Sequence, residues 1–304
     1  MAAGTSPSII ALPNDGWEVA FTANDGTLWL ATGSGDSVTS ATNPMRLGVN
    51  SGSSPSLAAL PNGNFEVAFK ANDGYLWLAT GSGTTITADG NPMRLGVQGT
   101  TTPSVAALPN GNVEVAFTAN DGYLWMATGN GATITAATNP MRLGVSSGSS
   151  PSLAALPNGN FEVAFKANDG YLWLATGSGT TITADGNPMR LGVASGASPE
   201  IVTLANGNFE TAFKANDGTL WLATGNGTTI TADANPSRSA SPDLRSPQAH
   251  CSATRPAGRG TAGHRVARTR APPTTTRRTT QSRSGSLAAA PPPCHLMPNS
   301  STSN

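Results

Sequence analysis

Side chains that could bind a small polar molecule recur along this chain at a constant interval of 48 residues. The tryptophans of this series are Trp29, Trp77, Trp125, Trp173 and Trp221, and tyrosines stand two positions before three of them, at Tyr75, Tyr123 and Tyr171. The charged residues with the same spacing are the glutamates Glu18, Glu66, Glu114, Glu162 and Glu210 and the arginines Arg46, Arg94, Arg142 and Arg190. Aromatic rings can stack on a ligand, and guanidinium and carboxylate groups can hydrogen bond to it.

Each series also has a structural interpretation. A tryptophan on a strand just after a tight turn is typical of a core residue that anchors a hairpin, and we rank this role above ligand contact. Thr27 and Thr219 replace the tyrosines in the outer repeats, and this variability favours a rim position and makes the tyrosines ligand candidates. The regular glutamates and arginines indicate a paired contact between strands or blades. The aspartates, such as Asp73, fall at turns and are expected to be turn residues.

The same regularity argues against an enzyme. A single catalytic centre requires residues that break the repeat, whereas every carboxylate and arginine of these series returns in unit after unit. Both cysteines and all three histidines lie after residue 238, so the repeats hold neither a thiol nucleophile nor an imidazole base. Each Asn-Asp-Gly turn offers one carboxylate, whereas Ca²⁺ takes about six to eight oxygen ligands. We therefore expect no catalytic residue, no metal and no cofactor.

One repeat predicts four short strands. An apolar run at 55–60 is followed by a turn and by the strictly alternating segment 65–70, a period of two that indicates a strand. The tight turn Asn72-Asp73-Gly74 precedes a third, aromatic-rich strand at 75–80. A polar connection at 81–91 then leads to a short last strand at 93–97, which reads Met-Arg-Leu-Gly-Val.

Four strands in a unit of this length predict an all-β fold, a β-propeller of five four-stranded repeats. The predicted propeller spans residues 1–238, and its repeats lie at about 7–54, 55–102, 103–150, 151–198 and 199–238. An open solenoid is the competing arrangement. Closure is the weak point, because the fifth repeat diverges after Asn235-Pro236 and lacks its Met-Arg-Leu-Gly-Val strand. An exposed strand edge can pair with another chain, so we expect a homo-oligomer through this incomplete last blade.

Residues 239–304 form a tail of a different kind. It is rich in Pro, Ser, Thr and Arg, and its nine arginines stand against Asp243 alone, whereas the repeats hold 8 basic and 16 acidic residues. Lacking a hydrophobic pattern, the tail is predicted to be disordered. The codons of residues 240–248, read two nucleotides out of phase, permit a peptide close to the start of another repeat. A frameshift product and an ordinary low-complexity tail are therefore both open.

The motifs resemble those of a known family. The string Thr22-Ala-Asn-Asp-Gly-Thr-Leu-Trp29 resembles a variant Asp-box, with Asn24 in place of the first Asp. Over residues 7 to about 236, the order Pro-Ser-x-x-Ala, Glu-Val-Ala-Phe, Asn-Asp-Gly-x-Leu-Trp and Leu-Gly resembles the blades of bacterial and fungal β-propeller lectins, the fucose-binding and tachylectin-like groups. This resemblance implies shallow sugar sites, repeated by blade, that use an aromatic platform and a few polar groups.

We therefore expect a multivalent carbohydrate-binding module whose partners are glycans or glycoconjugates. The alternative is a non-catalytic protein-interaction scaffold. The ligand candidates are the tyrosines and tryptophans named above together with Arg94, Arg142 and Arg190. No apolar run of about 20 residues predicts membrane insertion, and the basic tail lacks the interleaved aromatic residues that would favour nucleic acid. No signal peptide is visible, yet the resemblance favours a secreted, extracellular protein.

Overall fold

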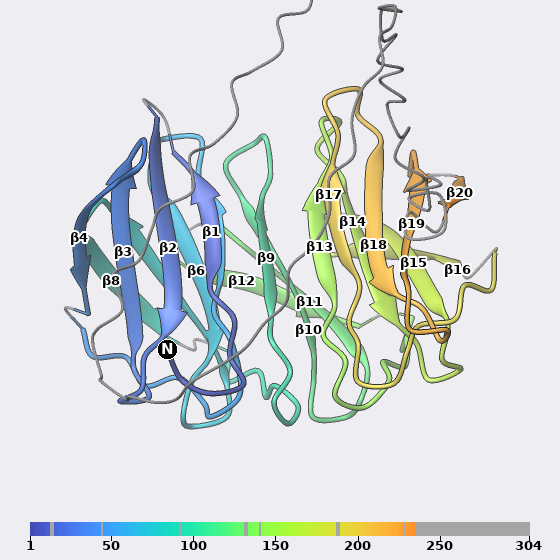
Figure 1. Cartoon of the computed structure of the whole chain (residues 1–304), viewed down its shortest axis with the longest axis horizontal. Helices are drawn as coiled ribbons and strands as arrows, with labels where there is room; N and C mark the ends of the chain where they lie inside the picture. The colour runs from blue at the N-terminus through green and yellow to red at the C-terminus, as the bar shows by residue number, and fades with distance from the viewer. Residues whose placement is uncertain are drawn as a thin grey trace, which may run out of the picture. The chain divides into compact units, whose positions relative to one another are not determined.

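The computed structural model describes residues 1–234 except 13–14, 44, 91–92, 131–132, 140, 187–188 and 228. The tail predicted at 239–304 lies outside the described residues. The described residues form an all-β propeller of five four-stranded antiparallel blades (Figure 1). They contain no helix long and apolar enough to cross a membrane.

Each blade uses four consecutive strands in chain order. Blade 1 holds β1 (Ser8–Ala11), β2 (Gly16–Thr22), β3 (Leu28–Ser34) and β4 (Ser37–Thr42). Blade 2 holds β5 (Ser56–Ala59), β6 (Phe65–Lys70), β7 (Leu76–Ser82) and β8 (Thr85–Gly90). Blade 3 holds β9 (Ser104–Ala107), β10 (Val113–Thr118), β11 (Leu124–Gly129) and β12 (Ile134–Thr138). Blade 4 holds β13 (Ser152–Ala155), β14 (Phe161–Lys166), β15 (Leu172–Ser178) and β16 (Thr181–Gly186). Blade 5 holds β17 (Glu200–Thr203), β18 (Phe209–Lys214), β19 (Leu220–Gly225) and β20 (Ile230–Ala234).

The second and third strands lie where the sequence pattern places them. In blade 2 the alternating segment becomes β6, and the Asn-Asp-Gly turn connects it to β7 with Gly74 at a φ of 84°. Glycine adopts this left-handed conformation at little cost, so the turn can be tight. The resulting register places Phe69 opposite Trp77 and Phe65 opposite Gly81. A Cβ on Gly81 would overlap the ring of Phe65, which explains why a glycine stands there.

The fourth strand differs from the prediction. The segment at 81–91, expected to be a connection, contains β8, whose alternating Thr and Ile residues suit an outer strand with one solvent-exposed face. The expected strand at 93–97 instead forms single bridges, from Gly96 to Tyr75 and from Val97 to Ala119 of the next blade. This segment therefore links neighbouring blades. Blade 5 has all four strands without it, so the expectation of an incomplete last blade was wrong.

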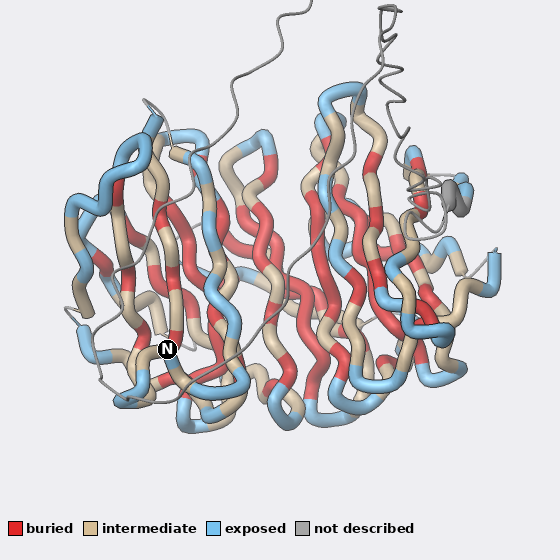
Figure 2. Tube along the Cα trace, viewed as in Figure 1, coloured by how far each residue is buried: buried red, intermediate tan, exposed pale blue. Residues whose placement is uncertain are grey.

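Two different faces of each blade meet its neighbours. In blade 2, the phenylalanine face carries Leu57, Phe65, Val67, Phe69 and Ile86, and these residues pack on blade 1. The opposite leucine face carries Ala58, Ala68, Leu76 and Leu78, and it packs on blade 3. Both faces are apolar, so the second strand is buried along its whole length in blades 2, 3 and 4, which Figure 2 shows in red. No blade has a core of its own, and stacking supplies it.

Hydroxyl groups tie the first strands together around a central channel of about 440 Å³. The amides of Ser6, Ser54, Thr102 and Ser150 each donate to the hydroxyl oxygen at the equivalent position of the next repeat, at 2.9–3.2 Å. A second ladder starts where the amide of Leu57 donates to Ser8 Oγ at 3.0 Å, and it repeats at each later junction. These contacts fix the angle between blades and hence the geometry of any site between them.

Candidate functional site

The candidate site is a pocket of about 370 Å³ between blades 3 and 4. One wall comes from blade 3 and the link that follows it, and the other wall comes from the second and third strands of blade 4. The lining residues are Tyr123, Arg142, Leu143, Gly144, Phe165, Ala167, Asn168, Asp169 and Trp173. The pocket thus combines three aromatic side chains, one cation, one carboxylate and one amide with small and aliphatic residues.

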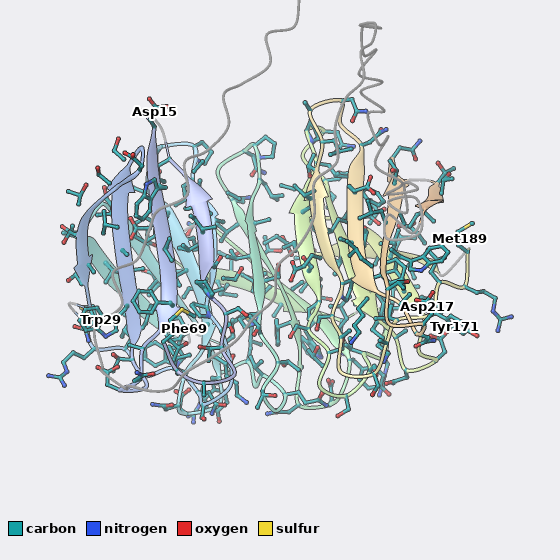
Figure 3. All side chains as sticks on the ribbon, in the orientation of Figure 1. Asp15, Trp29, Phe69, Tyr171, Met189 and Asp217 are labelled. Carbon is teal, nitrogen blue, oxygen red and sulfur yellow. The ribbon has the colours of Figure 1, made fainter. Side chains whose placement is uncertain are left out.

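An equivalent pocket of about 360 Å³ lies between blades 4 and 5. Each of its lining residues has the same place in the repeat as its counterpart in the first pocket, and they are Tyr171, Arg190, Leu191, Gly192, Phe213, Ala215, Asn216, Asp217 and Trp221. Figure 3 labels Tyr171 and Asp217, which lie near one another although they belong to different blades. The repeat therefore duplicates the whole pocket, including both walls.

Each arginine of the series with a tyrosine partner packs on that ring. The guanidinium carbons of Arg94, Arg142 and Arg190 lie 5.1, 4.8 and 5.2 Å from the ring centres of their tyrosines. These arginines, with Arg46, have backbone φ angles of 46–50°, in the left-handed region that non-glycine residues seldom adopt. A strained residue that recurs in every link points to a functional constraint.

The turn aspartate holds the tryptophan in place. Asp169 Oδ2 accepts a hydrogen bond from Trp173 Nε1 at 3.0 Å, and its Oδ1 accepts one from the amide of Tyr171 at 3.1 Å. The same two bonds, at 3.0–3.1 Å, reach Asp73 from the indole of Trp77 and the amide of Tyr75, and Asp121 from the indole of Trp125 and the amide of Tyr123. The aspartate is itself exposed, so it orients the indole while remaining on the surface of the pocket.

A glycine and an asparagine close the floor of the pocket. The amide of Asn168 donates to the carbonyl of Gly144 on the preceding link at 3.2 Å. A Cβ on Gly144 would overlap the side-chain nitrogen of Asn168, so the asparagine side chain keeps this position because a glycine stands beside it. Gly48, Gly96 and Gly192 have the same relation to the asparagines of their neighbouring blades.

The structure groups the predicted site residues across blades. Tyr123 and Arg142 meet Trp173 of the next blade, and Tyr171 and Arg190 meet Trp221. The tyrosine and tryptophan of one repeat therefore line successive pockets.

Tyr75 and Arg94 contact each other, and Trp125 has the corresponding place in blade 3. Trp77 lies at the junction of blades 1 and 2, where Thr27 stands in place of a tyrosine. Trp29 lies opposite Phe21 on the phenylalanine face of blade 1, which no described blade covers. Four of the tryptophans are half-buried and also pack against the inter-blade cores.

The glutamates do not pair with the arginines, contrary to expectation. They lie on the leucine faces, and Thr80 and Thr128 donate to the carboxyl groups of Glu66 and Glu114 from the adjacent strand at 2.9 Å. Burial raises the pKa values of Glu66, Glu114 and Glu162 to about 8 and that of Glu18 to about 7, and the threonine hydrogen bonds act in the opposite direction. Removal from water disfavours the ionised carboxylate.

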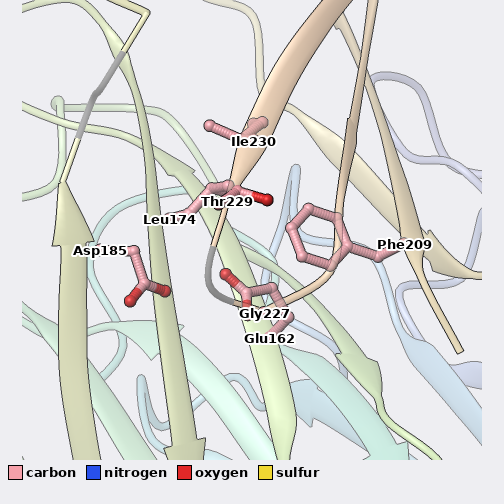
Figure 4. Close-up of a pocket in the computed structure, with 7 residues that line it drawn as sticks. All are labelled: Glu162, Leu174, Asp185, Phe209, Gly227, Thr229 and Ile230. Carbon is pink, nitrogen blue, oxygen red and sulfur yellow. The ribbon is translucent and has the colours of Figure 1, made fainter.

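One of these glutamates lines a smaller pocket of about 220 Å³ between blades 4 and 5, shown in Figure 4. Its hydroxyl partner, Thr176 Oγ1, lies 2.7 Å from Glu162 Oε2 and 2.6 Å from Asp185 Oδ2. A hydroxyl has one proton to donate, and Glu162, whose pKa burial raises to about 8, is protonated at neutral pH and can donate to the hydroxyl oxygen in return. This hydrogen bond gives Glu162 a structural role.

The turn aspartates, expected to be turn residues alone, also orient the tryptophans, and Gly144 and Gly192 belong to the pockets although they were not among the predicted site residues. The repeat does contain a signal for the aspartate, which stands four positions before the tryptophan. A tight hairpin brings two residues with this separation within hydrogen-bonding distance. The glycine has no comparable signal, because the contact that requires it comes from another blade.

No protein-family model and no curated protein match the sequence. Among solved structures, the lectin of Aleuria aurantia, described as a six-bladed β-propeller, is 14% identical, with a TM-score of 0.55 over 77% of this chain and 80% of that one. SapL1 lectin in complex with α-methyl fucoside is 12% identical, with a TM-score of 0.57 over 75% and 79%. AofleA from Arthrobotrys oligospora is 12% identical, with a TM-score of 0.53 over 76% and 73%. The five blades thus share the β-propeller fold of these lectins, as the blade motifs predicted.

Proposed function

We propose that this protein is a multivalent, non-catalytic carbohydrate-binding module whose sites are the pockets between blades. The observation that carries the proposal is the convergence of a tyrosine, an arginine, an aspartate and a tryptophan in one pocket, which recurs at the next junction. Pockets with apolar walls and a few oriented polar groups are the usual form of small-molecule sites.

The chemistry of the pocket suits a sugar ring. The half-buried indole of Trp173 offers a flat apolar surface on which the C–H groups of a pyranose can pack. Arg142 presents several N–H donors in a fixed plane, and Asp169 presents an acceptor, so neighbouring hydroxyl groups can be bound from both sides. Because the ring of Tyr123 supports the guanidinium, the arginine is already oriented before the ligand arrives, which lowers the entropy cost of binding.

Repetition makes weak single sites effective. Several equivalent pockets on one rigid propeller can engage several sugars of one surface, and the second and later contacts become intramolecular. The neighbouring Aleuria aurantia and SapL1 lectin structures are each described in complex with a methyl fucoside. Their shared fold supports a saccharide as the ligand class for the present pockets.

A protein-interaction scaffold is the second candidate. The residue before each arginine is an exposed methionine, and Met45, Met93, Met141 and Met189 are 44–48% exposed. Exposed methionines are common on surfaces that bind proteins, because the side chain adapts to different partners. Met189 is labelled in Figure 3 beside the candidate pocket of Tyr171.

Glycan-array binding of the full chain distinguishes the two. The Tyr75→Ala/Tyr123→Ala/Tyr171→Ala variant removes the support of three arginines, and we expect saccharide signal to fall by an order of magnitude or more. The matched control, Thr87→Ala/Thr135→Ala/Thr183→Ala, alters exposed positions on outer strands and should keep full signal. A silent array from folded wild-type protein would favour the scaffold.

A further inference from the structure

The small pocket of Figure 4, which we call the acidic pocket, is separate from the proposed saccharide sites. Trp173 stands opposite Phe165, close to the turn that joins β14 and β15. Glu162 stands opposite Thr176, toward the other end of the same two strands. The acidic pocket therefore lies at the end of the blade away from the candidate tryptophans.

The acidic pocket contains a buried acceptor that has no donor. Glu162 is fully buried, and within the part of the chain that the structure describes its Oε1 has no hydrogen-bond partner. When Glu162 is protonated on Oε2, it donates to Thr176 Oγ1, and Thr176 donates to Asp185. Oε1 then remains as a carbonyl oxygen that can only accept. A buried acceptor without a donor destabilises the folded state, so a ligand that supplies the donor is favoured.

A β-bulge brings the second carboxyl group to this place. Asp185 is the extra residue of the bulge where the β15–β16 register shifts, and Gly186 after it has a φ of 85°. Bulges re-aim a side chain and are frequent beside functional sites. The arrangement recurs in blade 2, where Asp89 is the extra residue and its Oδ2 lies 2.7 Å from Thr80 Oγ1.

Blade 3 shows what the aspartate changes. Ala137 stands there in its place, and the bulge falls two residues earlier, at Thr135. Both carboxyl oxygens of Glu114 then lie 2.9–3.0 Å from Thr128 Oγ1. Among the three blades that have a neighbour on each side, the unmatched glutamate oxygen thus accompanies the aspartate.

The other walls of the acidic pocket are apolar or can accept hydrogen bonds. Leu174, Phe209 and Ile230 form what we call its apolar wall. Thr229 donates its hydroxyl proton to Asn226 Oδ1 at 3.0 Å, so its oxygen is left to accept. The pocket thus offers acceptors beside an apolar surface.

The charge of the acidic pocket favours a monovalent ligand. Burial, and to a smaller extent the charge of Asp185, raises the pKa of Glu162 to about 8, so the negative charge at neutral pH is that of Asp185 alone. A divalent metal ion would require Glu162 to ionise beside the apolar wall, which burial disfavours. A ligand with a single positive charge and several N–H donors requires no such change.

We propose that the acidic pocket binds a small organic ammonium ion, a primary ammonium group on a short aliphatic chain. Such a group has three N–H donors and no acceptor. These donors match the carboxylate of Asp185, Oε1 of Glu162 and the hydroxyl oxygen of Thr229, and the aliphatic chain packs on the apolar wall. The site is independent of the saccharide pockets, so the protein would bind two different classes of ligand.

Methyl NMR of the full chain with 13C-labelled isoleucine tests this directly. Ile230 lines the acidic pocket, whereas Ile182 has the same place in the repeat and packs on blade 3, where alanine replaces the aspartate. Titration with n-butylammonium should shift the Ile230 signal saturably and leave Ile182 unchanged. n-Butanol, with the same carbon chain and no charge, should need at least about a tenfold higher concentration.

Three results of this titration would overturn the proposal. Equal responses to the alcohol and the ammonium ion would show that the pocket recognises only the carbon chain. Equal shifts at Ile182 and Ile230 would show that the acceptor set does not select the ligand. Saturation of the Ile230 response by Ca²⁺ at a lower concentration than by n-butylammonium would assign the pocket to a metal ion.

Variants of Asp185 provide the second test. Asp185→Ala introduces the residue that blade 3 carries naturally, so we expect a Tm within about 2 °C of wild type and loss of the Ile230 response. Asp185→Asn keeps the size of the side chain and should weaken binding by at least about tenfold. Asp36→Ala removes a negative charge from an exposed turn of blade 1 and should leave the response intact.

The saccharide sites serve as an internal reference for these variants. Because the acidic pocket is at the other end of the blade, glycan-array signal should be the same in wild-type protein and in both Asp185 variants. A silent array therefore bears on the saccharide proposal alone. An unchanged Ile230 response in both Asp185 variants would overturn the ammonium site alone.

Discussion

Arg142 packs its guanidinium carbon 4.8 Å from the centre of the Tyr123 ring while its own backbone is held at a φ of 46°. The side chain is thus positioned at a cost to the backbone. The same combination occurs at Arg94 and Arg190, so it belongs to the repeat unit. A binding role for the arginine explains why glycine does not stand at this position.

Arg142→Gly/Arg190→Gly should separate stability from binding. Glycine adopts this φ without strain, so we expect the free energy of unfolding to stay the same or to rise by about 1 kcal/mol. Saccharide binding should fall, because two pockets lose their donors. Chemical denaturation and glycan binding measure the two effects. Arg142→Lys/Arg190→Lys is the matched control: it keeps the charge but loses the planar fork, so its binding should also fall. Undiminished binding in the glycine variant would remove the arginines from the site.

Thr27→Tyr should add a site. The first link already holds Arg46 at a φ of 49°, and Trp77 stands on the next blade, so the tyrosine is the missing member of the set. We expect the number of saccharide molecules bound per chain to increase by one in a calorimetric titration. Thr27→Leu adds apolar bulk without a phenol ring to carry the guanidinium, and the number bound should then stay at the wild-type value. An unchanged number with tyrosine would show that the tyrosine and arginine do not suffice.

Gly144→Ala should damage both the junction and the pocket. The added methyl group overlaps the end of the Asn168 side chain, which must then leave its place at the junction and in the pocket. We expect a loss of about 1–3 kcal/mol in the free energy of unfolding together with weaker saccharide binding. In the double variant Gly144→Ala/Asn168→Ala the overlap is absent, so part of the stability should return. A double-mutant cycle measures this coupling, and strictly additive losses would contradict the contact.

The buried glutamates predict that stability falls as pH rises. In the folded state the pKa values of Glu66, Glu114 and Glu162 are about 8, against 4.5 for an exposed glutamate, so the folded protein binds more protons between these limits. The stabilisation is complete below about pH 4.5 and is lost as the pH passes 8, at no more than about 1.4 kcal/mol per pH unit for each group.

Denaturation at about pH 5 and about pH 9 measures this dependence. Glu66→Gln/Glu114→Gln/Glu162→Gln keeps an acceptor for the threonine hydroxyls but cannot ionise, so its stability should vary far less over the same range. Wild-type protein that is equally stable at both values would contradict the assignment of protonated, buried carboxyl groups.

The sequence was sufficient for the repeat, the number of blades and the second and third strands of each blade. A period of two at residues 65–70 and a glycine turn at Gly74 are local signals, and they are strong. The fourth strand was misplaced because Met93–Val97 is more apolar than Thr85–Gly90. Val97 of the apolar segment is buried between blades while Met93 is exposed, and the polar segment is an edge strand. Periodicity within one repeat cannot distinguish these two environments.

The composition of the candidate site was predicted only in part. The tyrosines, tryptophans and arginines were identified by their types, but the sequence could not show that Tyr123 meets Trp173 of the next blade, because that contact depends on the angle between blades. The pairing of Glu66 with Thr80 also follows from strand register, which places these two residues opposite one another. Register across a hairpin is set by the turn and not by the spacing of the repeat.

The central claim is that the pockets between blades bind a saccharide, and calorimetric titration of the full chain with the best saccharide from the array tests it most directly. The account predicts more than one equivalent site per chain and a decrease of two sites in Tyr123→Ala/Tyr171→Ala, with folding unchanged. Binding whose stoichiometry and affinity are the same in wild-type and variant protein would contradict it.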